Sequence, residues 1–209
     1  APFTRNRARL LRAEVLARLG QLEPAVADLN VLASEPGWQR AALAAKVDIL
    51  YSAGRAAGAA ADLGRLRQAA AEEQDAGALE TVARMYARMG DLDTALAVFD
   101  EVSEIRPFEA GPLTSRAQVL MAAGRPGAAA ASLEKAIERQ PGNLDLYVAL
   151  AGALDGAQKP REALNALARM SALGKSGEAR ALFERGRLLM TWGLSAPAVE
   201  AFESLVGEG

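Results

Sequence analysis

Residues 79–107 read LETVARMYARMGDLDTALAVFDEVSEIRP, and this stretch decides the fold. Apolar residues recur three and four positions apart on both sides of Gly90, which is the spacing of one helix face. Gly90 suits the left-handed residue that ends many helices, and Pro107 lies where a second helix would stop. The stretch therefore predicts two helices joined by a tight turn, and no strand pattern competes with it.

The same marks recur along the whole chain with a period of about 34 residues. The turn slot holds Gly20, Gly54, Gly90, Gly124, Gln158 and Gly193. Five residues after each turn slot stand Ala25, Ala59, Ala95, Ala129, Ala163 and Ala198, and four residues later Leu29, Leu63, Phe99, Leu133, Leu167 and Phe202. Four residues before each turn slot stands a large residue: Leu16, Leu50, Tyr86, Leu120, Leu154 and Leu189. Three residues before each of these stands a smaller one: Ala13, Val47, Ala83, Ala117, Ala151 and Gly186. Marks that keep phase six times indicate an internal repeat.

A helix–turn–helix unit of this length, with small, Gly, Ala and large marks in that order, resembles the tetratricopeptide repeat. The resemblance covers essentially the whole chain and implies six repeats at about 6–39, 40–75, 76–109, 110–143, 144–178 and 179–209. It departs from the family at the early Trp, whose slot holds Arg9, Leu43, Leu79, Leu113, Tyr147 and Leu182.

The resemblance implies an all-α fold, a right-handed α-solenoid (superhelix) of helix–turn–helix repeats. One hairpin cannot bury its apolar face alone, whereas stacked hairpins share a continuous core. We therefore expect a single array over residues 1–209. The chain opens at Ala1 without a Met, and the apolar pattern continues to Val206 near its end, so we expect a segment of a longer protein.

Composition limits the classes of function. The chain is 51% apolar and 24% charged, which is typical of a globular protein, and its net charge of −2 gives no bulk attraction for nucleic acid or anionic lipid. It contains no Cys and no His, which excludes disulfides, the usual zinc sites and His-based triads. No apolar run reaches the length of a membrane span. We expect no cofactor, no metal, no nucleic-acid partner and no direct membrane insertion.

Short matches to catalytic motifs fail on their context. Ser132 and Lys135 have the S-x-x-K spacing of some serine acyl-enzymes, but they lie in the middle of a predicted second helix. Gly174-Lys175-Ser176 resembles the end of a P-loop, yet Arg169 stands where that loop needs glycine. Asp91-Leu92-Asp93 lacks the later ligands of a calcium loop, and we expect these acids to cap a helix. The sequence predicts that the chain is not an enzyme.

The resemblance also implies where a partner would bind, because first helices line the concave face of such arrays. The inward slots that we select as partner-binding residues are Glu14, Asp48, Tyr51, Glu80, Arg84, Arg88, Thr114, Gln118, Met121 and Arg187. The groove is expected to be acidic near its start, basic around Arg84 and Arg88, and polar beyond them. Tyr51 and Met121 would offer apolar contacts to a protein or peptide partner.

These observations favour a non-catalytic protein–protein interaction scaffold. Family habit and the absence of Cys favour a bacterial envelope or secretion machine, such as exopolysaccharide export or pilus biogenesis, with a location in the periplasm or cell envelope. The bias toward Ala, Arg and Gly is typical of a GC-rich bacterial genome. The alternative is a regulatory or substrate-positioning module of a larger transferase, and the flanking sequence of the parent protein would discriminate between the two. The apolar last helix also predicts self-association through the array ends.

Overall fold

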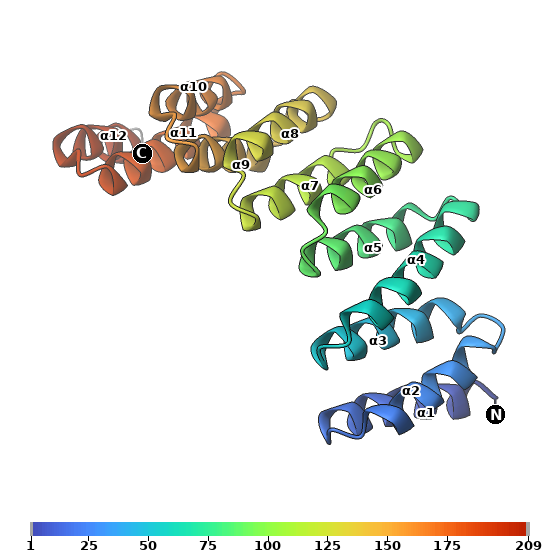
Figure 1. The fold of residues 1–209 in the computed structure, drawn as a ribbon. Coiled ribbons are helices and arrows are strands. Elements are labelled where there is room, and N and C mark those ends of the chain that lie inside the picture. Colours follow the sequence, from blue (N-terminus) through green and yellow to red (C-terminus); the bar gives the residue numbers. More distant parts are fainter. Residues whose placement is uncertain (1, 208–209) are drawn as a thin grey trace. The chain divides into compact units, whose positions relative to one another are not determined.

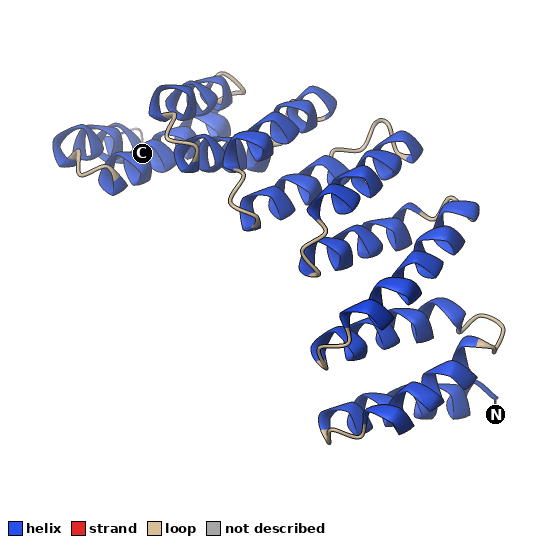
Figure 2. Ribbon diagram, in the orientation of Figure 1, coloured by secondary structure: helices blue, strands red, loops and turns tan. Residues whose placement is uncertain are grey.

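Helices and the turns between them make up residues 2–207, the part of the chain that the computed structural model describes (Figure 2). Within this range there is no strand. The outermost residues of the predicted array, Ala1 and residues 208–209, lie outside it. The chain divides into two compact units, residues 1–105 and 106–209, and each is described by itself.

Each unit consists of three helical hairpins (Figure 1). Unit 1 contains α1 (Pro2–Arg18), α2 (Leu22–Ala33), α3 (Gln39–Ser52), α4 (Ala56–Glu72), α5 (Ala76–Arg88) and α6 (Leu92–Ile105). Unit 2 contains α7 (Gly111–Ala122), α8 (Pro126–Arg139), α9 (Leu144–Gly156), α10 (Pro160–Ser171), α11 (Lys175–Thr191) and α12 (Ser195–Gly207). We call the odd-numbered helices first helices and the even-numbered helices second helices.

Within a unit, every helix packs against the helix before it and the helix after it. This arrangement confirms the predicted all-α fold of helix–turn–helix repeats. The right-handed sense of the superhelix and its continuity over residues 1–209 stay predictions.

The turn slots end the first helices as the sequence predicts. Their backbone φ angles are all positive, from 59° to 85°, in Gly20, Gly54, Gly90, Gly124, Gln158 and Gly193. At the second turn, the Gly54 N–H donates to the Tyr51 carbonyl and the Arg55 N–H donates to the Leu50 carbonyl, which satisfies carbonyl groups at the helix end. Gln158 adopts the same conformation without the freedom of glycine.

The helix starts also follow the sequence. Pro126 and Pro160 open α8 and α10, where a missing N–H costs no hydrogen bond. The Asp91 carboxylate accepts a hydrogen bond from the Thr94 N–H at 3.2 Å, so it caps α6 as expected. Asp93 lies inside the first turn of α6, where a negative charge favours the helix dipole.

The repeated small and large marks form the core. The six Ala residues after the turn slots are at most 2% exposed, and five of the six large residues that follow them are as deeply buried. The exception is Phe202 in α12, which is half-buried. A Cβ atom at Gly186 would lie 2.5 Å from the Phe202 ring, so only glycine fits beneath it. Leu16 and Tyr86 are also half-buried.

Polar pairs join the two helices inside three of the hairpins, a feature that the sequence analysis did not anticipate. They occupy the positions eight residues before and after the turn slot: Arg12 with Asp28, Lys46 with Asp62, and Arg116 with Ser132. Asp28, Asp62 and Ser132 are all buried, and each is satisfied by its partner across the hairpin. The same two positions hold Val82 and Val98 in the third hairpin, and Leu150 and Ala166 in the fifth.

Candidate partner-binding surface

A groove of about 570 Å³ lies between the first helices α1 and α3 of unit 1, near their C-terminal ends. We call it the first-helix groove, and its lining residues are Glu14, Ala17, Arg18, Gly20, Leu22, Asp48, Ile49, Ser52 and Ala53. Figure 1 shows α1 and α3 as the two first helices at the N-terminal end of the chain. The groove therefore brings together two predicted site residues, Glu14 and Asp48, from helices in successive repeats.

Several residues that line this groove are not among the predicted site residues. Arg18 lies four residues after Glu14, so a helical spacing already placed the two on one face. Ile49 and Ala53 also share a helix face by this spacing, and they supply the apolar part of the lining. Their apolar character made them look like core positions only.

A second set of predicted residues connects α3 with α5. Arg88 donates a hydrogen bond to Asp48 Oδ1 at 2.8 Å, and the Tyr51 hydroxyl donates to the Arg88 main-chain carbonyl at 2.5 Å. Glu80 and Arg84 form an ion pair of 3.1 Å along α5. The expected basic stretch around Arg84 and Arg88 thus faces carboxylates, and its charge is largely compensated within unit 1.

The remaining predicted residues lie in unit 2. The Thr114 hydroxyl donates to the Ala110 carbonyl at 3.0 Å, so it bonds within its own helix. Gln118 and Met121 are exposed on α7. Arg187 pairs with Glu184 at 2.8 Å beside a hollow of about 150 Å³ between α9 and α11. Unit 2 therefore repeats the position of the first-helix groove in a smaller form.

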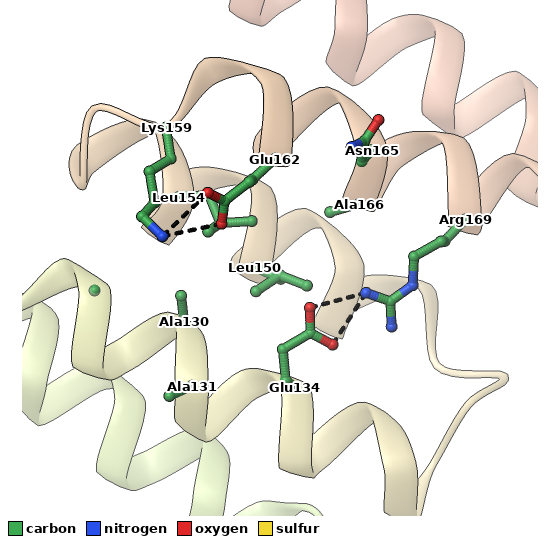
Figure 3. A pocket seen from close by; sticks show the side chains of 11 residues that line it. Ala130, Ala131, Glu134, Leu150, Leu154, Lys159, Glu162, Asn165, Ala166 and Arg169 are labelled. Carbon is green, nitrogen blue, oxygen red and sulfur yellow. Dashed lines mark hydrogen bonds and ion pairs between the residues drawn. The ribbon is translucent and has the colours of Figure 1, made fainter.

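Unit 2 also carries a hollow of about 350 Å³ on its second helices, which we call the second-helix pocket (Figure 3). Glu134 of α8 and Arg169 of α10 point toward each other across it and pair at 2.8 Å. Lys159 and Glu162 pair at 3.1 Å on the same wall. Because these charged side chains already pair with one another, the second-helix pocket has fewer unpaired charges for a charged ligand than the first-helix groove has.

The catalytic alternatives gain no support from their surroundings. The Ser132 hydroxyl is 1% exposed, accepts a hydrogen bond from Arg116 at 2.7 Å and donates to the Ala128 carbonyl. A nucleophile needs a free hydroxyl beside a base. Among residues 2–207 no cluster of three acidic side chains is arranged to hold a metal ion. No helix in this range combines the length and apolar character of a bilayer span.

Comparisons with known proteins agree with this architecture. The family model described as Tetratricopeptide repeat matches residues 120–182, which run from the end of α7 into α11. A structure described as "Crystal structure of MamA" is 19% identical, with a TM-score of 0.52, and the alignment covers 77% of this chain and 92% of that chain. A structure described as "MamA 41-end from Desulfovibrio magneticus RS-1" is 20% identical, also with a TM-score of 0.52, covering 83% and 96%. At these identities the likeness shows the fold alone.

A search of curated protein sequences gave no significant match. The matched family segment lies within the in-phase marks that recur along the chain, and paired helices extend through both units. Residues 120–182 thus match the tetratricopeptide-repeat model, and the helical hairpins of the chain are similar in fold to these solved structures.

Proposed function

We propose that the chain is a scaffold that binds a protein or peptide partner along its first helices. The tetratricopeptide-repeat fold supports an interaction role, because stacked hairpins present extended surfaces to a partner. The observation that carries the proposal is the first-helix groove, which is open, partly apolar and lined by Glu14 and Asp48. Such a combination of apolar area and a few oriented polar groups is what peptide recognition requires.

The proposal is for binding without catalysis, and for a protein rather than a nucleic acid as partner. The engaged hydroxyl of Ser132 supports the first point. The net charge of −2 supports a protein partner, because proteins bind the phosphate backbone of nucleic acids mainly through an excess of Lys and Arg. We extend the proposal to a bacterial envelope or secretion assembly, supported by the Cys-free composition and the bias toward Ala, Arg and Gly.

We further propose that the ends of the array self-associate. The slot twelve residues after each turn is buried in the inner second helices: Leu32, Leu66, Ala136 and Met170 are at most 3% exposed. In the last helix, α12, the same slot holds Leu205, which is only half-buried. Five residues before the turn slot, Val15 of α1 is 52% exposed, whereas Met85 is 7% exposed. α1 carries five Arg and one Glu, and α12 carries two Glu and no cation, so the two end helices have opposite charge.

Site-specific photo-crosslinking in the native cells tests the main proposal. A benzoylphenylalanine in place of Ser52 places the probe in the first-helix groove, and the same residue in place of Ala61 places it on the exposed side of α4. We expect a discrete crosslinked product from the Ser52 position that the Ala61 position does not give. Equal products from both, or a product from Ala61 alone, would contradict binding on the first helices.

A further inference from the structure

Two half-buried acids in residues 2–207, Glu14 and Glu35, have no hydrogen bond or ion pair at the carboxylate, and of these two only Glu14 lines the first-helix groove. The other seven half-buried acids all have partners within the chain: Asp48, Asp75, Glu80, Glu101, Glu134, Asp155 and Glu184. The two buried acids, Asp28 and Asp62, are paired as well. Partial burial removes some of the water that would hydrate a carboxylate. Pairing with a cation compensates for this loss and stabilises the charged carboxylate.

The surroundings of Glu14 favour a positive charge. Asp48 lines the same groove from α3 and engages Arg88 through Oδ1. The C-terminal ends of α1 and α3 meet there, at Arg18 and Ser52, and each helix dipole places partial negative charge at that end. Two carboxylates and two helix ends therefore contribute negative potential to one groove.

The apolar part of the lining selects among cations. Ala17, Ile49 and Ala53 offer aliphatic surface next to Glu14. A lysine or arginine side chain buries its methylene groups on such a surface while its charged end reaches a carboxylate. A divalent metal ion needs several oxygen ligands in a fixed geometry, and the groove does not assemble three acidic side chains.

We propose that the first-helix groove binds a lysine or arginine side chain of a peptide segment of the partner, paired with Glu14 and flanked by Asp48. This inference rests on the proposed scaffold function and specifies the chemistry of its partner. The occupant is a basic peptide segment, because the charge of the groove complements it and the groove, at about 570 Å³, has room for neighbouring residues.

Arg18 lies in the same groove and gives the proposal a second, opposite consequence. Its positive charge reduces the local negative potential without pairing with Glu14. Removing that charge should strengthen the binding of a basic peptide, whereas removing the charge of Glu14 should weaken it. A merely structural effect of either substitution would not produce opposite signs.

Selection from a displayed library of random short peptides tests the inference on the wild-type chain. We expect the selected peptides to be enriched in Lys and Arg beside small apolar residues. For a selected peptide, Glu14→Gln should lower affinity by about tenfold, the effect of losing one charge-assisted hydrogen bond. Arg18→Gln should raise affinity by about threefold. Glu104→Gln, at an exposed position of α6, makes the same charge change outside the groove and should leave affinity unchanged.

The possible results separate this inference from the proposed function. Selected peptides that bind the first helices without Lys or Arg, and that ignore Glu14→Gln, would overturn the basic-peptide inference alone. Peptides that bind only second helices would overturn both. Melting curves of the variants that match the wild-type curve would establish that changes in affinity do not arise from unfolding.

Discussion

Phe99 is the largest side chain that is fully buried, and it lies in α6 within unit 1. We expect Phe99→Ala to lower the free energy of unfolding by about 3–5 kcal/mol, through lost burial and the cavity that remains. Phe108 is 87% exposed, so Phe108→Ala is the matched control and should change stability by less than about 0.5 kcal/mol. Urea unfolding followed by circular dichroism measures both. A loss below about 1 kcal/mol for Phe99→Ala would mean that packing between hairpins does not stabilise the fold.

The turn slots allow a reciprocal experiment on backbone conformation. Gln158 has a φ of 59° and Gly124 a φ of 69°, and no atom would lie within 4 Å of a Cβ at Gly124. Gln158→Gly should therefore raise the free energy of unfolding by about 1 kcal/mol, and Gly124→Gln should lower it by a similar amount. The two melting temperatures should move in opposite directions. Shifts of the same sign would show that side-chain contacts, rather than φ, decide this position.

Sequence reasoning located these positions because glycine and alanine mark them repeatedly in phase. Even Gln158 could be placed, since its neighbours kept the period although its residue type gave no signal. Phe202 occupies the same repeat slot as Phe99, but it is half-buried in α12. A repeat pattern shows which side chains face a neighbouring hairpin, but it does not show how completely the neighbour covers them.

The hairpins differ in how their two helices are joined, and this difference can be tested by exchange. Asp62 pairs with Lys46 at 2.8 Å, and both side chains are at most 15% exposed. Asp62→Val leaves Lys46 without this partner and should lower the free energy of unfolding by about 3 kcal/mol. The double variant Lys46→Val/Asp62→Val copies the third hairpin, which has Val82 and Val98, and should return to within about 1 kcal/mol of the wild type. A double variant that is less stable than Asp62→Val would show that the ion pair is not replaceable by apolar packing.

The first hairpin should show a pH dependence of stability. The hydrogen bond from Arg12 to Asp28 lowers the pKa of Asp28 in the folded chain. Because the pKa of Asp28 is lower in the folded chain, its ionised carboxylate stabilises the fold at pH values above the pKa of Asp in the unfolded chain, about 3.9. This contribution to stability disappears as the pH falls through the pKa of Asp28 in the folded chain. Asp28→Asn should therefore reduce stability at neutral pH and flatten its decline below about pH 4. Glu138→Gln, at an exposed position of α8, should retain the wild-type decline in the same urea titrations.

These polar pairs could have been found from the sequence, because Asp28, Asp62 and Ser132 occupy one slot of the repeat. The contact between Asp48 and Arg88 could not, since it depends on how far two long side chains reach between α3 and α5. The predicted site residues were chosen by slot, and slots fix the helix face but not the rotamers. The groove around Glu14 therefore became visible only when α1 and α3 were placed side by side.

Self-association belongs to the properties of the complete array. We expect the sedimentation coefficient to rise with protein concentration and to fall with added salt, because the charges of α1 and α12 are opposite. Val15→Glu puts a negative charge on an exposed apolar position of α1, which opposes the acidic α12, and should abolish the rise. Leu173→Glu changes a similarly exposed residue in a loop and should have no effect. A wild-type chain that sediments as a monomer at every concentration would contradict association through the ends.

Hydrogen–deuterium exchange of the chain with and without a bound partner peptide tests most directly whether the first helices are the binding surface. We expect slower amide exchange at the C-terminal ends of α1 and α3, around residues 14–20 and 48–54, while α4 and the C-terminal half of α2 stay unchanged. Protection confined to α8 and α10 at the second-helix pocket, or absent from the first helices, would contradict this expectation.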